Sequence, residues 1–336
     1  MRTSNAIKRG ATLYCFQEQY FFGKYDLEDC IAAVADMGGE GVDLIPDQMI
    51  AEFPKVSDHF IGQWKEWMDQ YGVVPTCMDD FVESALYAHR EVSEDELVER
   101  FKKAVQLAKR MGFTVIREQF ALSEDSKLMS LPLLERCFPY AQEAGISIGL
   151  EVHAPNYIQN PQIDGYLEMI LKKNSPYLGL IPDFSIFCTD IYKRFDEYYR
   201  RHGVREQVIE ITHDSYRNDF GKEGNLKRLS GSHLSEIEYE YASTMFNWHK
   251  KTEPETMLEF SEYIHHCHAK FQCMTKDYRD EALDMAHIVD VLRKMNYHGC
   301  ISSEYEGNRW VHDDHVDDCV EQVRRHQILL KNVLGY

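Results

Sequence analysis

The chain has 336 residues, 44% of them apolar, so it is long enough for one large α/β domain or two ordinary ones with a substantial core. Its 56 Asp and Glu residues outnumber 37 Lys and Arg residues, and a net charge of −19 lacks the basic footprint that DNA or RNA binding requires. The same acidity disfavours anionic membranes, and no run of eighteen apolar residues occurs to span one.

Short apolar runs alternate with amphipathic segments along the first half of the chain. Predicted strands begin near residues 11, 41, 73, 113, 146 and 178, the first of them spanning 11–16, so successive starts lie 30 to 40 residues apart. The intervening helices include one capped by Asp26, one over 60–71, one opened by the capping box of Ser93 and Glu96, and one over 131–144. One strand plus one crossover helix, repeated at this pitch, is typical of parallel α/β proteins.

The spacing changes after the sixth predicted strand. Residues 184–260 are charged and rich in tyrosine, with helical spacing, and we interpret them as an insertion that forms a lid, a subunit contact or simply solvated helices. The stretch VIEIT over 208–212 has the composition of a strand, but a ninth strand would prevent closure of an eight-stranded barrel, so we interpret it as helix.

Two more strands are predicted over 263–269 and 299–304, followed by a helix over 316–334. The sequence therefore predicts a single domain over 1–336. Its fold class is α/β, a (β/α)8 TIM barrel with a helical insertion between strands 6 and 7.

The cysteines point to a reducing compartment. There are nine, with no C-x-x-C pair, and Cys77, Cys267 and Cys300 lie within predicted strands, where we interpret them as small apolar residues. The first ten residues, MRTSNAIKRG, contain no apolar segment of the kind found in secretion signals. We therefore expect a cytoplasmic protein.

Four predicted strands end in residues that bind divalent metals. They are Glu151 in GLEV, Asp183 after LGLIP, His268 in HHCHA and Glu304 in ISSE. The C-terminal strand ends of such a barrel carry its chemistry, and burying three carboxylates together without a cation is costly. We predict that these four residues bind one ion, although each alone also suits a rim ion pair or a core histidine. The oxygen-rich set favours Mn²⁺, or Mg²⁺ or Co²⁺, over a structural zinc.

The histidine ligand has two candidates. Strand alternation puts both His266 and His268 on the inner face, and His268 is nearer the strand end. His266 is then left to support the site or contact the substrate, or to be the ligand itself if the strand limits differ by two residues.

His153 shares a strand face with Glu151, one pleat further along. An imidazole suits proton transfer near neutral pH, so we predict a general base here, with a hydrogen-bonded rim histidine as the alternative.

Further polar and aromatic residues follow the predicted ligands. Lys270 and Glu306 each stand two residues beyond a predicted ligand and are expected to contact the substrate, or to pair with one another. Trp310 is expected to stack on a sugar or aryl ring, or to pack in the rim, as are Tyr20, Phe21, Phe22 and Tyr305.

The motifs GLEVH, IPDFS, HCHAK and SSEYEG resemble those of the xylose-isomerase-like TIM-barrel superfamily, which includes sugar isomerases and keto-sugar epimerases. In the epimerase branch the Glu, Asp, His, Glu quartet binds one divalent ion, and the two glutamates also shuttle protons. The resemblance thus implies catalytic roles for Glu151 and Glu304.

The phrases QEQYFFGKYDLEDCIAA, GVDLIPDQM and EVHAP resemble more specifically the catalytic large subunit of bacterial C-glycoside deglycosidases. That resemblance implies a 3-keto C-glucoside of a plant polyphenol as substrate, Mn²⁺ as cofactor, a small β-rich partner subunit in a hetero-oligomer, and His153 as the base.

Three functional hypotheses follow. In the first, the enzyme enolises a keto-sugar and then cleaves its C–C glycosidic bond, as a lyase. In the second, it is a metal-dependent isomerase or epimerase that returns the proton to the sugar. In the third, the barrel is a non-catalytic binding or scaffold subunit.

Overall fold

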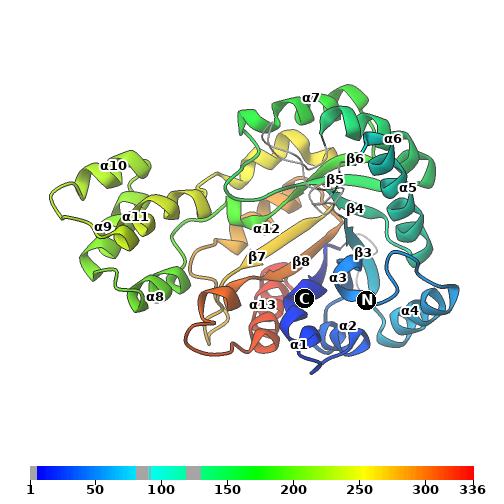
Figure 1. The fold of residues 1–336 in the computed structure, drawn as a ribbon, viewed down its shortest axis with the longest axis horizontal. Coiled ribbons are helices and arrows are strands. Elements are labelled where there is room, and N and C mark those ends of the chain that lie inside the picture. The colour runs from blue at the N-terminus through cyan, green and yellow to red at the C-terminus, as the bar shows by residue number, and fades with distance from the viewer. Residues whose placement is uncertain (1–5, 81–89, 91, 119–129) are drawn as a thin grey trace.

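The strands of the computed structural model form one parallel sheet that curls into a barrel; residues 6–80, 90, 92–118 and 130–336 are described (Figure 1). The strand order is β6-β5-β4-β3-β2-β1-β8-β7. The strands are β1 (Lys8–Thr12), β2 (Gly41–Leu44), β3 (Val74–Asp79), β4 (Val115–Glu118), β5 (Ser147–Val152), β6 (Leu178–Pro182), β7 (Cys267–Phe271) and β8 (Cys300–Tyr305). The two end strands meet at the parallel bridges Leu180–Ile264 and Asp183–His268, which nearly close the ring. The predicted (β/α)8 TIM barrel is confirmed.

Helices cover the outside of the barrel and bury its apolar core between sheet and helix (Figure 1). They are α1 (Gln17–Phe21), α2 (Leu27–Asp36), α3 (Pro46–Met49), α4 (Asp58–Tyr71), α5 (Glu94–Met111), α6 (Leu131–Ala144), α7 (Asp164–Lys173), α12 (Met285–Lys294) and α13 (Cys319–Leu334). The capping box of Ser93 and Glu96 begins α5, and Gly112 ends it with φ at +89°, a conformation that favours glycine.

Some predicted boundaries are wrong. The first strand was expected from residue 11 to 16, but β1 ends at Thr12, whose side chain accepts a hydrogen bond from the Tyr14 backbone at 3.3 Å and begins the 3₁₀ turn η1 (Leu13–Phe16). Strand β7 starts later than predicted, at Cys267, and α13 begins at Cys319, after the cap residue Asp318. Apolar residues continue from β1 into η1, so the hydrophobic pattern does not mark the end of that strand. At α13 the Asp318 side chain caps the helix, which leaves Val316 and Asp317 outside it.

The segment between β6 and β7 is helical, and its middle part, residues 193–248, lies to one side of the barrel (Figure 1). It contains η4 (Phe184–Ile186), α8 (Lys193–Arg201), α9 (Glu206–Arg217), α10 (Gly221–Arg228), α11 (Glu236–Trp248) and η5 (Pro254–Tyr263). The stretch 208–212 lies within α9, so the choice of helix over strand is confirmed. We call residues 193–248 the helical insertion.

The nine cysteines are all free thiols, and eight of them are buried. Cys77, Cys267 and Cys300 lie on β3, β7 and β8 as expected. Among the described residues, no helix is long and apolar enough to cross a membrane.

Candidate metal centre

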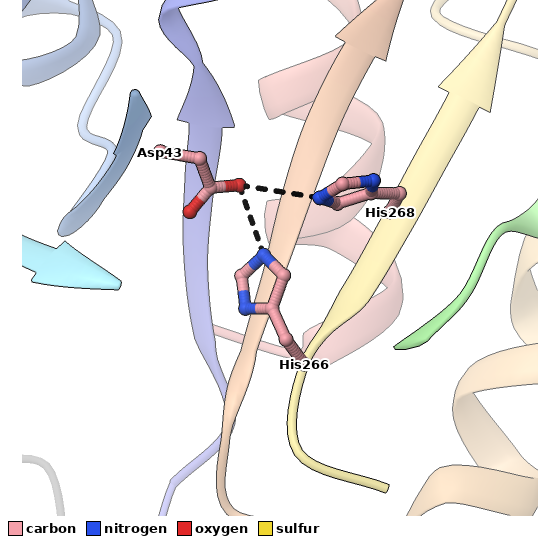
Figure 2. A group of neighbouring side chains, drawn as sticks. All are labelled: Asp43, His266 and His268. Carbon is pink, nitrogen blue, oxygen red and sulfur yellow. Dashed lines mark hydrogen bonds and ion pairs between the residues drawn. The ribbon is translucent and has the colours of Figure 1, made fainter. Parts of the chain in front are cut away.

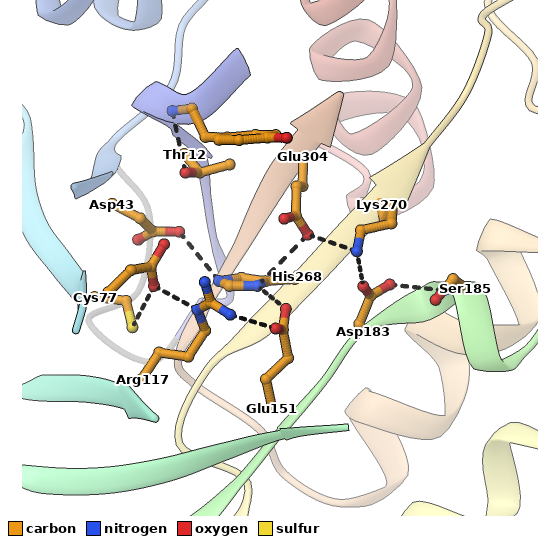
Figure 3. A network of polar contacts seen from close by, with 12 residues as sticks. Thr12, Asp43, Cys77, Arg117, Glu151, Asp183, Ser185, His268, Lys270 and Glu304 are labelled. Carbon is orange, nitrogen blue, oxygen red and sulfur yellow. Dashed lines mark hydrogen bonds and ion pairs between the residues drawn. The ribbon is translucent and has the colours of Figure 1, made fainter. Parts of the chain in front are cut away.

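Three of the predicted ligands meet inside the barrel at its C-terminal end (Figure 3). Nδ1 of His268 on β7 lies 2.6 Å from Oε1 of Glu151 on β5 and 3.6 Å from Oε2 of Glu304 on β8. One ligand atom from each lies within 4.8 Å of the others, and all three residues are buried. Because parallel strands end at the same rim, residues 36 to 153 positions apart in the sequence share one point.

Asp183, the fourth predicted ligand, is linked to Glu304 through a lysine. It follows β6 and pairs with His268 through a backbone bridge. Its Oδ1 accepts a hydrogen bond from the Ser185 backbone at 2.8 Å, and its Oδ2 lies 2.6 Å from Lys270 Nζ. The same ammonium lies 3.8 Å from Glu304 Oε2 and 3.7 Å from Glu306 Oε1. Lys270 therefore neutralises part of the charge, and its predicted pairing with Glu306 is present.

Burial and charge set the protonation of the cluster. Burial raises the pKa of Glu304 to about 8, although Lys270 and His268 act in the opposite direction. Burial alone would lower the pKa of His268, but Glu304 and Glu151 raise it to about 10. For Glu151, burial is outweighed by the Arg117 guanidinium, which holds the pKa well below its usual range. Carboxylates that are buried this close to one another are stabilised by a bound cation.

Glu304 Oε2 and His268 Nε2 are buried and have no hydrogen-bond partner among the described residues. Opposite charges lie beyond hydrogen-bond distance, His268 Nδ1 and Lys270 Nζ at 3.6 and 3.8 Å from Glu304 Oε2, and Asp43 Oδ2 at 3.8 Å from His268 Nε2. Both are atoms that bind metals. The donor set and these two atoms fit a divalent ion.

His266 lies deeper in the barrel and faces a different carboxylate (Figure 2). Its Nε2 lies 2.9 Å from Oδ2 of Asp43 on β2, which also accepts a hydrogen bond from Thr76 Oγ1 at 2.6 Å through Oδ1. Burial raises the pKa of Asp43, but the charge of His266 outweighs it, and the pKa falls to about 2. Asp43, His266 and His268 form a second group with metal-ligand spacing.

Arg117 on β4 supports the cluster from the other side and was not predicted (Figure 3). Its Nε donates to Asp79 Oδ1 at 2.9 Å and its Nη1 to Glu151 Oε2 at 2.5 Å. Neither Asp43 nor Asp79 was predicted as a site residue. The signal was available, because a charged residue inside an apolar strand such as GVDLI or FTVIR is costly to bury without a partner.

A family model described as "Xylose isomerase-like TIM barrel" matches residues 31–326. The chain belongs to this family.

The curated relatives of this xylose isomerase-like chain are deglycosidase subunits. A "C-glycoside deglycosidase alpha subunit" of Arthrobacter globiformis is 28% identical over 318 residues, covering 90% of this chain and 84% of the relative. A "3'-dehydrocarminate deglycosidase alpha subunit" of a Microbacterium species is 26% identical and covers 99% of this chain and 97% of the relative. The resemblance to C-glycoside deglycosidases is thereby confirmed.

Solved structures share the fold at lower identity. The IOLI protein with a bound zinc atom has a TM-score of 0.59 at 13% identity and covers 98% of both chains. L-ribulose 3-epimerase has a TM-score of 0.58 at 12% identity and covers 98% of this chain and 94% of its own.

In this xylose isomerase-like barrel, His153 stands just after β5 and is half-buried. Its Nδ1 lies 2.7 Å from the Ala154 carbonyl oxygen. A carbonyl only accepts hydrogen bonds, so Nδ1 carries the proton and Nε2 is left as the basic atom.

Trp310 packs onto the helical insertion. It ends the 3₁₀ turn η6 (Gly307–Trp310), and its ring centroid lies 4.0 Å from that of Phe195 and 5.3 Å from that of Tyr198, both on α8. The exposed Trp248 ring approaches to 6.4 Å. The sequence left two roles open for Trp310, stacking on a substrate ring and packing in the rim. These contacts correspond to the packing role.

Proposed function

We propose that the chain is the metal-dependent catalytic subunit of a C-glycoside deglycosidase, a lyase that cleaves the bond between a 3-keto glucose and a phenolic ring. The buried meeting of Glu151, His268 and Glu304 carries this proposal, with Asp183 beside them. The deglycosidase names of relatives that align along nearly the whole chain support it.

The proposed ligands are Glu151, Asp183, His268 and Glu304. Three carboxylates and one imidazole suit Mn²⁺, with Mg²⁺ or Co²⁺ as alternatives, better than a sulfur-rich zinc site. The bound ion would polarise the sugar ketone and balance negative charge that develops on its oxygen. His268 is preferred over His266 because its imidazole, and not that of His266, lies beside both glutamates.

The proton chemistry belongs to the side chains. His153 presents Nε2 as the base that removes the proton from the carbon next to the ketone, with Glu304 as the alternative base. Lys270 and Glu306 bind sugar oxygens, since an ammonium and a carboxylate there offer both a donor and an acceptor. Arg117 holds the Glu151 carboxylate in place from behind.

Proton removal leaves an electron pair that forms the C=C bond of an enolate. When this enolate collapses, the pair of the bond between the sugar and the aryl carbon leaves with the aryl carbon, which takes up a proton. The products are an unsaturated keto-sugar and a free phenol, so atoms and electrons balance. An electron-rich phenol makes that carbon basic enough to be protonated.

The second candidate is a keto-sugar isomerase or epimerase. It is favoured by one observation: Glu151 and Glu304 approach the same His268 nitrogen, at 2.6 and 3.6 Å, so two carboxylates face one site. Two such bases could remove a proton and return it elsewhere.

The relatives are named alpha subunits. We propose that this chain likewise assembles with a small β-rich partner subunit, and that the helical insertion provides a lid or a subunit contact.

The test combines the chain, its partner subunit and Mn²⁺ with a 3-keto C-glucoside and follows release of the free phenol by chromatography. Release that disappears in Glu304→Gln supports the proposal. Solvent deuterium entering keto-sugars, without release of phenol from any aryl C-glucoside, would instead establish the isomerase.

A further inference from the structure

A concavity lies beside the proposed metal centre, between the segments that follow β1 and β8. It has a volume of about 490 Å³, within the range of about 300–1,000 Å³ typical of small-molecule sites. One wall is formed by Tyr14 of η1 with Phe21 and Phe22, and the other by Arg309 of η6 with Val316. We propose that this cavity is the subsite for the aromatic aglycone, a planar phenolic ring system attached to the sugar; this inference rests on the proposed function.

The inner end of the cavity is connected to the metal centre. Glu306, two residues after Glu304, lies 3.7 Å from Lys270 Nζ and 3.3 Å from Arg309 Nη2. The same Arg309 nitrogen donates to the Tyr14 hydroxyl at 2.8 Å. A sugar held by Glu304 and Lys270 thus has the Tyr14–Arg309 pair beside it, where the bond to the ring must pass.

The outer end of the cavity is apolar. Phe21, Phe22 and Val316 are 63%, 73% and 71% exposed, which is unusual for side chains that gather around one concavity. Phenyl rings stack over the whole face of a planar aromatic ligand, whereas a free sugar offers them only its C–H faces between hydroxyl groups. The cavity therefore favours a substrate with an aromatic half over a free keto-sugar.

The polar end matches a phenol. The Tyr14 hydroxyl both donates and accepts, and the guanidinium donates to phenolic oxygen and stacks on ring faces. This chemistry distinguishes the cavity from a flat apolar patch that binds a protein partner. Such a patch would need only the outer phenyl rings and not the polar end.

The two walls are fixed to one another by a carboxylate. Glu18 of α1 accepts a hydrogen bond from Asn308 Nδ2 at 2.8 Å and is paired with His312. The subsite is therefore held open by contacts of the folded chain itself.

Direct binding tests the subsite without any turnover. Isothermal calorimetry with a free hydroxylated flavone should give about tenfold weaker binding for Phe21→Ala/Phe22→Ala than for the wild type. Phe220→Ala, which removes a 50% exposed phenyl ring from the helical insertion, should bind like the wild type. Tyr14→Phe should weaken binding of the hydroxylated flavone but not of unsubstituted flavone.

Turnover by the assembled enzyme separates the two proposals. The double variant should raise KM for an aryl 3-keto C-glucoside about tenfold and leave deuterium exchange of 3-keto-glucose unchanged. If the wild type cleaves the substrate, and the double variant has the same KM and the same flavone affinity as the wild type, the subsite is wrong but the deglycosidase proposal holds. If flavone binding depends on Phe22 but no cleavage occurs, the subsite holds and the deglycosidase proposal is overturned. Loss of the partner subunit from the double variant, with flavone affinity retained, would assign this surface to the partner and also overturn the subsite.

Discussion

His268 and Glu151 meet across a strand that separates them: the His268 Nδ1 on β7 lies 2.6 Å from the Glu151 Oε1 on β5, with β6 between. Glu304 approaches the same nitrogen from β8. A metal entering here finds its donors already gathered, so little ordering has to accompany binding.

The first prediction concerns metal content. His268→Gln should weaken Mn²⁺ binding by roughly 100-fold, because it removes a donor from the centre of the cluster. Inductively coupled plasma mass spectrometry after gel filtration measures the bound metal. The exposed His298 supplies the control, and His298→Gln should retain the wild-type content. Normal metal in His268→Gln together with loss in His266→Gln would reverse the assignment of the ligand.

The second prediction concerns the base. His153→Ala should retain bound metal and lose turnover by about 10²–10⁴-fold, the usual contribution of a positioned proton acceptor. Metal content and phenol release are measured on the same preparation. Loss of the metal in this variant would identify His153 as a ligand instead.

Local signals predicted much of the barrel. The capping box at Ser93 and Glu96 and the glycine at 112 define α5 at both ends in sequence and in structure. The prediction that the first strand continues through LYCF at residues 13–16 was wrong. The composition of this stretch suits a strand, but the Thr12 hydroxyl caps a turn there. Competition between a side chain and the sheet for one backbone N–H is invisible in an apolar pattern.

The sequence could predict those site residues that lie at the ends of strands. Placing Glu151, His268 and Glu304 at the same rim needed only the strand count. Their partners could not be found that way, because contact between Arg117 and Glu151 depends on strand register and side-chain reach. The metal assignment stays a prediction.

The third prediction concerns Arg117. Arg117→Met should lower the free energy of unfolding by about 3–5 kcal/mol, because Asp79 and Glu151 would each lose a buried partner. Chemical denaturation measures it. Arg324→Met, on the exposed face of α13, should change stability by less than about 1 kcal/mol. Adding Asp79→Asn to Arg117→Met should recover part of the loss, and failure to do so would contradict the ion-pair explanation.

The fourth prediction separates two roles of Trp310. If its ring mainly holds the helical insertion through Phe195, Trp310→Ala should speed proteolysis within residues 193–248 and lower the free energy of unfolding by about 1–3 kcal/mol. If it mainly stacks on substrate, KM should rise with stability unchanged. Limited proteolysis and steady-state kinetics together decide, and we expect the first result.

The fifth prediction is a pH dependence centred on His213 in α9. Its Nδ1 lies 3.0 Å from Asp190 and its Nε2 2.8 Å from Asp196, while Arg217 pairs with the first carboxylate and the Tyr241 hydroxyl donates to the second. Burial alone would lower the pKa of His213, but the two carboxylates raise it from 6.5 to about 9.

Folding therefore favours the protonated form of His213. Its stabilising contribution is fully present below about pH 6.5 and is lost as the pH rises through 9. Between pH 6.5 and 9 the wild type should lose about 2 kcal/mol of stability that His213→Gln, already less stable, does not lose. Denaturation curves at several pH values give the slope of stability against pH for both proteins. Thiols elsewhere in the chain titrate in both, so their effect cancels in the difference between the two slopes.

Because His213 ties α9 to α8 and to the segment after η4, the loss of stability should begin in the helical insertion, where hydrogen exchange would report it first. Parallel slopes for the two proteins would mean that His213 is not charged in the folded chain.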